Sequence, residues 1–331
     1  MQTIPDPAIG DAVTTHAATP SSNRIAFIGA GHVGATAAYA MMLRALFREI
    51  VLIDSNEALA EAEAADITDA NALARPARIW AGSYADAATA GIAVITAGAA
   101  SHGSESRLSL ASASAGIVIE CVQRLARAGF SGVLVIASNP VDIMTTLAIR
   151  HAGLPRHRVI GTGTLLDTSR LKQVLSAALD VSASAIEGYV LGEHGDSEVT
   201  VFSSVRIGGQ SIHDFDEAAK ALDLPAIGAQ VRDAAYGIVR GKGFTSFGVA
   251  TAIVRICEAI VRNERCVLPV STWIDQHFGH NELCSSLPCI IGSGGIERVI
   301  VPVLNANEED ALSSSARKLG DALRALDGLA G

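Results

Sequence analysis

A histidine between two glycines is the residue with the clearest capacity for chemistry in this chain. His194 lies in the stretch Leu191-Gly192-Glu193-His194-Gly195-Asp196-Ser197, directly after the apolar run 189–191. Histidine has an unperturbed pKa close to neutral, so it can donate and accept a proton at cellular pH. Glycines allow a sharp turn and a close approach to a ligand. Because such a histidine is more often a hydrogen-bonded turn residue than a catalyst, this stretch alone leaves both roles open.

A glycine-rich turn near the start of the chain predicts a dinucleotide site. The residues Gly29-Ala30-Gly31-His32-Val33-Gly34 follow a predicted strand, 24–28, and precede a helical run through Leu46. This order places backbone N–H groups and a helix N-terminus against a pyrophosphate. The first glycine permits the tight turn, the second the approach of the phosphate, and the third the close packing of helix on strand. The cofactor-binding residues predicted here are Gly29, Gly31, Val33 and Gly34.

The next predicted strand, 49–53, ends at an acidic residue. Asp54 follows Gly34 by twenty positions, where a carboxylate can accept hydrogen bonds from both ribose hydroxyls of an adenosine. Its charge would repel a 2′-phosphate, and residues 55–57 offer no Arg or Lys to bind one. NAD is therefore the predicted cofactor, with a plain helix-capping aspartate as the alternative.

Strands alternate with helices through the first half of the chain. Further strands are predicted at 78–81, 92–96 and 132–136, and helices at 57–71 and 108–128. This alternation favours right-handed crossovers and an α/β fold with a doubly wound parallel sheet of the Rossmann type. Ligands bind beyond the carboxyl ends of such strands. The residues expected to cluster there are Gly29, Asp54, Gly98 and Asn139.

A mixed α+β catalytic domain is expected to follow the parallel sheet. Its predicted elements are the histidine strand, polar–apolar alternation at 199–207, and helices at 165–179, 227–240, 245–262 and 308–326. The 331 residues suffice for two hydrophobic cores. The predicted division is a flexible N-terminal arm over 1–23, an NAD-binding domain over 24–160 and the catalytic domain over 161–331.

Composition excludes several classes of function. With 34 acidic and 25 basic residues, the formal net charge of −9 argues against a nucleic-acid partner. No stretch approaches the roughly 18 apolar residues of a membrane span, and no signal-peptide pattern is present. The five cysteines form no C-x-x-C pair. We therefore expect reduced thiols, no metal site and a cytoplasmic location.

Six motifs together resemble the lactate/malate dehydrogenase family, in its L-lactate dehydrogenase branch of L-2-hydroxyacid dehydrogenases. They are Gly29-Ala30-Gly31-His32-Val33-Gly34, Gly103-Ser104-Glu105-Ser106-Arg107-Leu108, Ala137-Ser138-Asn139-Pro140-Val141-Asp142, Leu166-Asp167-Thr168-Ser169-Arg170, Gly192-Glu193-His194-Gly195-Asp196-Ser197 and Lys242-Gly243-Phe244-Thr245. The resemblance runs from about Arg24 to the C-terminal helix. It implies reversible hydride transfer between NADH and a 2-keto acid, and a homotetramer or homodimer.

The resemblance also implies roles for single residues. His194 would supply the proton, and Asp167 would accept a hydrogen bond from the other ring nitrogen. Arg170 lies three residues after Asp167 on one helical face, and would clamp the substrate carboxylate with two parallel hydrogen bonds. Arg107, after a lid over 98–106, would polarise the ketone oxygen. The other implied substrate-binding residues are Asn139 near the reacting carbonyl, Ser101 in the lid and Thr245 along the pocket.

The position of Ser101 bears on the choice of substrate. Malate members of the family carry an arginine at this lid position, so a malate dehydrogenase is the nearest alternative and a disfavoured one. Lactate members typically carry glutamine there, and the smaller serine predicts room for 2-keto acids larger than pyruvate. A catalytically silent NAD-binding protein is the other alternative, although it would not need the acid–base and carboxylate-binding residues together.

Overall fold

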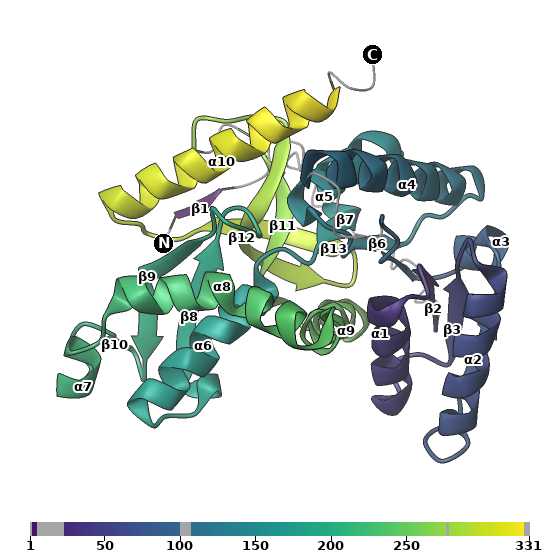
Figure 1. Cartoon of the computed structure of the whole chain (residues 1–331), viewed down its shortest axis with the longest axis horizontal. Coiled ribbons are helices and arrows are strands. Elements are labelled where there is room, and N and C mark those ends of the chain that lie inside the picture. The colour runs from purple at the N-terminus through teal and green to yellow at the C-terminus, as the bar shows by residue number, and fades with distance from the viewer. Residues whose placement is uncertain (1, 5–22, 100–106, 276–277, 328–331) are drawn as a thin grey trace.

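The computed structural model describes residues 2–4, 23–99, 107–275 and 278–327. Within them a large mixed sheet runs through the molecule, with helices on both of its faces, and a small sheet lies beside it (Figure 1). The strand order in the large sheet is β1-β13-β12-β11-β7-β6-β5-β2-β3-β4.

The parallel half of this sheet is of the doubly wound type. Its strands are β2 (Arg24–Ile28), β3 (Glu49–Ile53), β4 (Arg78–Ala81), β5 (Ile92–Ile95), β6 (Val133–Ile136) and β7 (Val159–Gly161). The chain moves outward from β2 to β4, then returns to β5 on the other side of β2. Ligands bind at such a reversal point, beyond the carboxyl ends of the strands. The predicted fold class is confirmed, and the predicted strand ends agree with the structure to within one residue.

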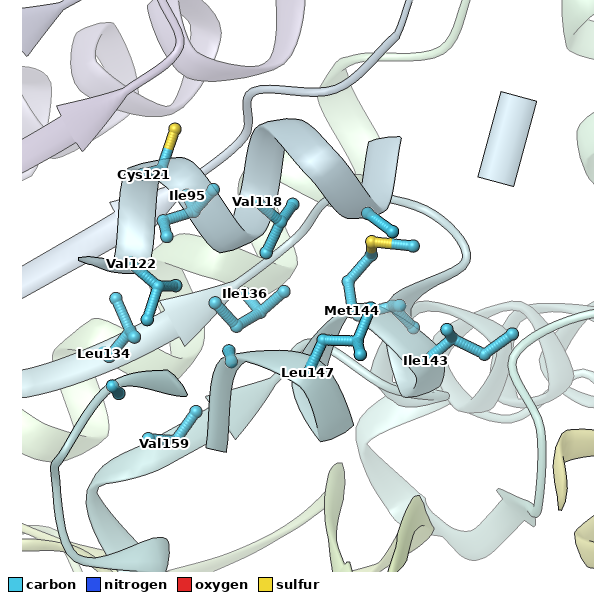
Figure 2. Packing of buried hydrophobic residues seen from close by; sticks show 14 of the residues in the cluster. Ile95, Val118, Cys121, Val122, Leu134, Ile136, Ile143, Met144, Leu147 and Val159 are labelled. Carbon is cyan, nitrogen blue, oxygen red and sulfur yellow. The ribbon is translucent and has the colours of Figure 1, made fainter. Parts of the chain in front are cut away.

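Helices cover both faces of the parallel half. They are α1 (His32–Leu43), α2 (Glu57–Asn71), α3 (Tyr84–Ala88), α4 (Arg107–Arg127) and α5 (Val141–His151). Successive residues of β5 point to opposite faces, so Ala93 and Ile95 join one core while Ile92 and Val94 join the other. Figure 2 shows the first core, where Val118 and Val122 of α4 meet Ile136 of the sheet and Met144 and Leu147 of α5. Burial of both sheet faces explains why these strands are continuous apolar runs.

Antiparallel strands extend the same sheet beyond β7. They are β11 (Cys266–Ile274), β12 (Leu283–Gly292), β13 (Gly295–Val301) and β1 (Gln2–Ile4). Strand β11 joins β7 through the pair Ser271 and Gly161, so the second half of the chain shares the sheet of the first. None of these strands is predicted from the sequence. For β1 the structure differs from the expected arm without regular structure, and residues 5–22 of that arm lie outside the described residues.

The remaining elements lie outside the parallel half, and those around the small sheet enclose a third core. They are α6 (Leu165–Leu179), β8 (Ile186–Leu191), β9 (Val199–Ile207), β10 (Gln210–Ser211), α7 (Glu217–Lys220), α8 (Leu224–Lys242), α9 (Phe247–Val261) and α10 (Ala306–Asp327), with short 3-10 helices at Arg156–Arg158 and Ala183–Ala185. Helices α6 and α8 cover the small sheet β10-β9-β8, whereas α9 packs on α1 of the first half (Figure 1). Among the described helices, none combines the length and apolarity needed to cross a bilayer.

Candidate active site

His194 lies in the turn that follows β8, and contacts from three directions hold it there. The turn begins at Gly192, whose φ of +88° is left-handed and whose added Cβ would lie 2.8 Å from Ser315 Oγ. Backbone hydrogen bonds between Gly192 and Ser286 of β12 anchor this start. The backbone N–H of His194 donates to Asp142 Oδ2 at 2.7 Å, and Nδ1 lies 2.6 Å from Asp167 Oδ2. The ring orientation is therefore set, with Nε2 as the nitrogen that a substrate can reach.

Asp167 and Arg170 come from the first turns of α6. Arg170 Nη1 donates to Asp167 Oδ1 at 2.7 Å, while the other carboxylate oxygen is bonded to His194. The Asp167 side chain is 1% exposed. The predicted spacing on one helical face is thus realised, and Asp167 joins the histidine to the arginine. Since a guanidinium has five N–H donors, Arg170 can still bind a substrate carboxylate.

The surroundings of His194 favour its protonated form. Burial lowers its pKa, but the hydrogen bond and negative charge of Asp167, with the charge of Asp142, outweigh burial and raise the pKa to about 9. The hydrogen-bonded carboxylate therefore favours the imidazolium form at neutral pH, and the side chain of His194 is 26% exposed.

Asp142 is a residue of this site that the sequence did not single out. It lies in the first turn of α5, is 1% exposed, and accepts hydrogen bonds from the backbone of His194 and from Ser271 Oγ at 2.6 Å. Burial raises its pKa to about 6. The signal available was its place in the Asn139-Pro140-Val141-Asp142 motif, but a carboxylate in a first helical turn usually interacts with the helix end.

Glu198 is a second residue that was missed. It directly precedes β9, and its carboxylate lies within 4.8 Å of ligand-type atoms of Asp167 and His194. Among the described residues its buried Oε1 has no hydrogen-bond partner. Burial, followed by the negative charge of Asp167, raises its pKa to about 8. No sequence pattern identifies it, because a glutamate before an alternating strand is typical of a solvated residue.

The glycines predicted to bind the dinucleotide lie at the reversal point of the sheet. Gly29 has φ +108°, and an added Cβ would lie 2.6 Å from the backbone N of Ala97. Gly34 packs so closely that its Cβ would lie 2.0 Å from the Gly29 carbonyl oxygen, whereas a Cβ on Gly31 would meet no described atom within 4 Å. The space beside Gly31 and the tight contact at Gly34 fit a pyrophosphate bound against the start of α1.

Asp54 lies at the mouth of a cavity beside this turn. Its Oδ2 accepts from the Ala30 backbone N–H at 2.7 Å and its Oδ1 from that of Asn56 at 2.9 Å. The cavity has a volume of about 260 Å³, and its walls include Gly29, Asp54, Tyr84 and Gly98. The structure therefore brings three of the predicted cofactor residues, Gly29, Asp54 and Gly98, to one pocket. Val33 is half-buried and packs against the core on the α1 side, and it does not line this cavity.

For the remaining predicted site residues, the structure gives a location but no hydrogen bond within the site, or does not describe the side chain. Asn139 is exposed between β6 and α5, and Thr245 is half-buried in the connection from α8 to α9. Next to Thr245, the ring of Phe244 stacks on His32 of the dinucleotide turn at 3.8 Å between centroids, so this connection touches the cofactor site. Arg107 is the first residue of α4, but its side chain lies outside the described part, as does Ser101 altogether.

Comparisons with known proteins agree with this geometry. Family models of the lactate/malate dehydrogenases match the chain, the NAD binding domain over residues 23–161 and the alpha/beta C-terminal domain over residues 164–326. The chain is 39% identical over 309 residues to L-lactate dehydrogenase 2 of Enterococcus faecalis, covering 92% of this chain and 98% of that protein. It is 40% identical over 307 residues to L-lactate dehydrogenase of Thermus aquaticus, covering 92% and 99%.

Solved structures show the same similarity. The minor L-lactate dehydrogenase of Enterococcus mundtii, in a ligand-bound form, superposes with a TM-score of 0.89 at 35% identity and covers 92% of this chain and 98% of its own. A lactate dehydrogenase from a deep-sea metagenome library superposes with a TM-score of 0.90, also at 35% identity, and covers 93% and 99%.

Proposed function

Because this chain belongs to the lactate/malate dehydrogenase family, we propose that it is an NAD-dependent L-lactate dehydrogenase-type oxidoreductase. It interconverts 2-keto acids and L-2-hydroxy acids. The family resemblance predicted from the motifs is confirmed by the matches over both halves of the chain. Relatives named L-lactate dehydrogenase favour the lactate branch, and they favour neither a malate dehydrogenase nor a silent NAD-binding protein.

The observation that carries the proposal is the single carboxylate bonded to both an acid–base group and a carboxylate-binding group. Asp167 binds Nδ1 of His194 through one oxygen and Nη1 of Arg170 through the other. Reduction of a 2-keto acid needs a proton donor near the ketone oxygen and a cation near the carboxylate. Asp167 holds these two groups in a fixed relation, which suits the neighbouring ketone and carboxylate of one substrate.

The chemistry of the site is that of proton transfer at a fixed histidine. NADH supplies the hydride when it is bound. In reduction, protonated His194 donates from Nε2 to the ketone oxygen as negative charge develops there, and in oxidation the neutral ring accepts that proton. Asp167 stabilises the imidazolium and holds its orientation. Arg170 binds the substrate carboxylate and so determines which face of the keto group is presented.

The cofactor is held by the first half of the chain. The open space beside Gly31 and the N-terminus of α1 would receive the pyrophosphate, and Asp54 would accept from the ribose hydroxyls. Gly98 borders the same pocket. We assign Asn139 to hydrogen bonding near the reacting carbonyl and nicotinamide, and Arg107, at the start of α4, to polarising the ketone oxygen.

The substrate range follows from Ser101. Serine is smaller than the glutamine that lactate members of the family typically carry at this lid position, so we expect more room for the substrate's variable group, whose other wall we assign to Thr245. We infer that pyruvate is reduced, that larger acids such as 2-ketobutyrate or phenylpyruvate reach an equal or higher kcat/KM, and that oxaloacetate is not preferred. An NADH absorbance assay over these acids tests this. Pyruvate exceeding every larger acid by about tenfold would show the Ser101 argument to be wrong.

The central test of the function is His194→Ala. Loss of the proton donor should lower kcat by about 10²–10⁴-fold while NADH binding, measured by fluorescence titration, stays unchanged. The matched control is His213→Ala, an exposed histidine near β10, which should keep full activity. If the His194 variant lost NADH affinity in proportion to its rate, the acid–base assignment would not stand.

We further infer that the protein is a homodimer or homotetramer. Apolar side chains on α1 and α9 are exposed, with Leu43 at 51% and Phe247 at 71%. Phe247 also borders a surface hollow of about 330 Å³ between α1, α2 and α9. A second copy of the chain covering this surface would bury these apolar side chains. The five unpaired cysteines agree with a reducing, cytoplasmic location.

A further inference from the structure

Glu198 combines close attachment to the catalytic turn with an unsatisfied buried oxygen. Its backbone N–H donates to the Gly195 carbonyl at 3.1 Å, so the same short turn carries both His194 and Glu198. Its Oε1 is buried without a hydrogen-bond partner among the described residues. A buried polar atom left without a partner is costly, so native structures retain one only for a reason. The mechanism described above does not use this carboxyl group.

The charges around Glu198 come from three elements. Asp167 and Arg170 face it from α6, His194 from the turn after β8, and Arg232 from α8. Asp167 and Glu198 cannot both ionise cheaply when their oxygens lie within 4.8 Å of one another. Asp167 is hydrogen-bonded to both Arg170 and His194, whereas Oε1 of Glu198 has no partner among the described residues, so the proton is better accommodated on Glu198.

A metal ion is a poorer explanation of the same cluster. Asp167, His194 and Glu198 are close enough together to ligate a cation. However, the guanidinium of Arg170 already occupies one oxygen of Asp167, and the ring of His194 occupies the other. A proton on Glu198 makes this carboxyl group neutral and so removes the repulsion between the two carboxylates. Unlike a metal ion, it places no further cation beside His194 and Arg170.

We propose that Glu198 is a positioning residue that must carry a proton for a 2-keto acid to bind beside Arg170. In the neutral form it leaves the positive charge of Arg170 and His194 available to the substrate. In the ionised form it would compete for both cations and repel the incoming carboxylate, so the site would reject its anionic substrate. This inference rests on the proposed function, since it concerns the binding of that substrate.

The pH profile of kcat/KM separates Glu198 from His194. In the wild type, binding should require both a neutral Glu198, with its pKa near 8, and a protonated His194, with its pKa near 9. On the alkaline side, the plot of log(kcat/KM) against pH should therefore fall with a limiting slope of two, because two protons are lost. Glu198→Gln resembles the neutral acid, so its kcat/KM at pH 6.5 should match that of the wild type to within about twofold. On the alkaline side its kcat/KM should depend on one proton only, that of His194. At pH 9 it should then exceed the wild type by about tenfold.

The control is Glu217→Gln on α7, whose carboxyl side chain is 90% exposed. It should reproduce the wild-type profile. Superimposable profiles for the wild type and Glu198→Gln would overturn the proposal, and so would a loss of more than about tenfold at pH 6.5, which would mean that the ionised form is needed.

Infrared spectroscopy provides a readout that needs no turnover. A protonated carboxyl has a C=O stretch that a carboxylate lacks, so the difference spectrum between pH 7 and pH 10 should contain this band for the wild type and Glu217→Gln. It should be missing for Glu198→Gln, and its presence there would contradict the assignment. If the wild type reduced no 2-keto acid at all, the proposed function would fail, while this band would still decide whether Glu198 holds a proton.

Discussion

At the scale of single residues, Asp167 connects the charged groups of the site, because it is hydrogen-bonded to both Arg170 and His194. Replacing it with asparagine keeps the shape but removes the charge that raises the pKa of His194 to about 9. We expect Asp167→Asn to lower kcat/KM by about 10²–10⁴-fold at pH 8 and to move the alkaline limb to lower pH. Asp180→Asn, at the other end of α6 in a left-handed conformation that asparagine tolerates, is the control. If the alkaline limb of the Asp167→Asn profile did not move, Asp167 would not be the group that raises the pKa of His194.

The same ion pair should make stability depend on pH. Because folding raises the pKa of His194 from about 6.5 to about 9, the stabilisation is fully present below pH 6.5 and is lost as pH rises through 9. The difference in unfolding free energy between the wild type and Asp167→Asn, measured with urea, should thus be larger at pH 6 than at pH 9.5. A constant difference would mean that Asp167 contributes by packing alone.

We propose that Asp54 determines the choice of cofactor. Its carboxylate faces the pocket beside Gly29 and would repel a 2′-phosphate. Asp54→Ala should weaken NADH binding and bring the kcat/KM values for NADH and NADPH closer together. Glu57→Ala, an exposed carboxylate in the first turn of α2, changes the net charge equally and should leave the cofactor ratio unaltered. A ratio unchanged by Asp54→Ala would place the ribose elsewhere.

At the scale of elements, the contact between β2, its turn and α1 depends on glycine in two different ways. A Cβ on Gly34 would lie 2.0 Å from the Gly29 carbonyl oxygen, so Gly34→Ala must push α1 away from the turn. We expect a loss of about 1–3 kcal/mol in unfolding free energy, together with weaker NADH binding.

Gly31→Ala is the matched variant for this contact. Its Cβ would meet no described atom within 4 Å, so thermal denaturation should show a stability close to that of the wild type. NADH affinity should fall nonetheless, because the methyl group takes the space that the pyrophosphate needs. Equal NADH affinity in Gly31→Ala and the wild type would contradict the placement of the pyrophosphate.

At the scale of the whole molecule, we propose the exposed apolar surface of α1 and α9 as the interface of the predicted oligomer. Leu43→Glu places a charge on the exposed apolar surface and should shift the protein toward monomer in analytical ultracentrifugation. Val303→Glu, equally apolar and exposed at 69% but located after β13, should sediment as the wild type does. If Leu43→Glu remained oligomeric while Val303→Glu became monomeric, the interface would lie elsewhere.

Local signals in the sequence were sufficient to predict the strands and helices of the first half of the chain. The strand 24–28, the glycine turn and the helix after it are adjacent in the chain, and their pattern depends on backbone geometry and on burial of neighbouring residues. For the same reason the spacing of Asp167 and Arg170 on one helical turn predicted their proximity, which the 2.7 Å bond between them confirms. The roles of these residues came from the motifs of the family and stay predictions.

Only the tertiary structure decided the rest of the site. His194 meets Asp142 of α5 and Asp167 of α6 across 52 and 27 positions of the chain, and no local pattern encodes such pairings. Strands β11 and β12 escaped prediction because they are buried too evenly to alternate. Glu198 owes its raised pKa to burial and to a carboxylate on another element. Protonation depends on the surrounding charges and on the exclusion of water, and these exist only once distant segments have packed together.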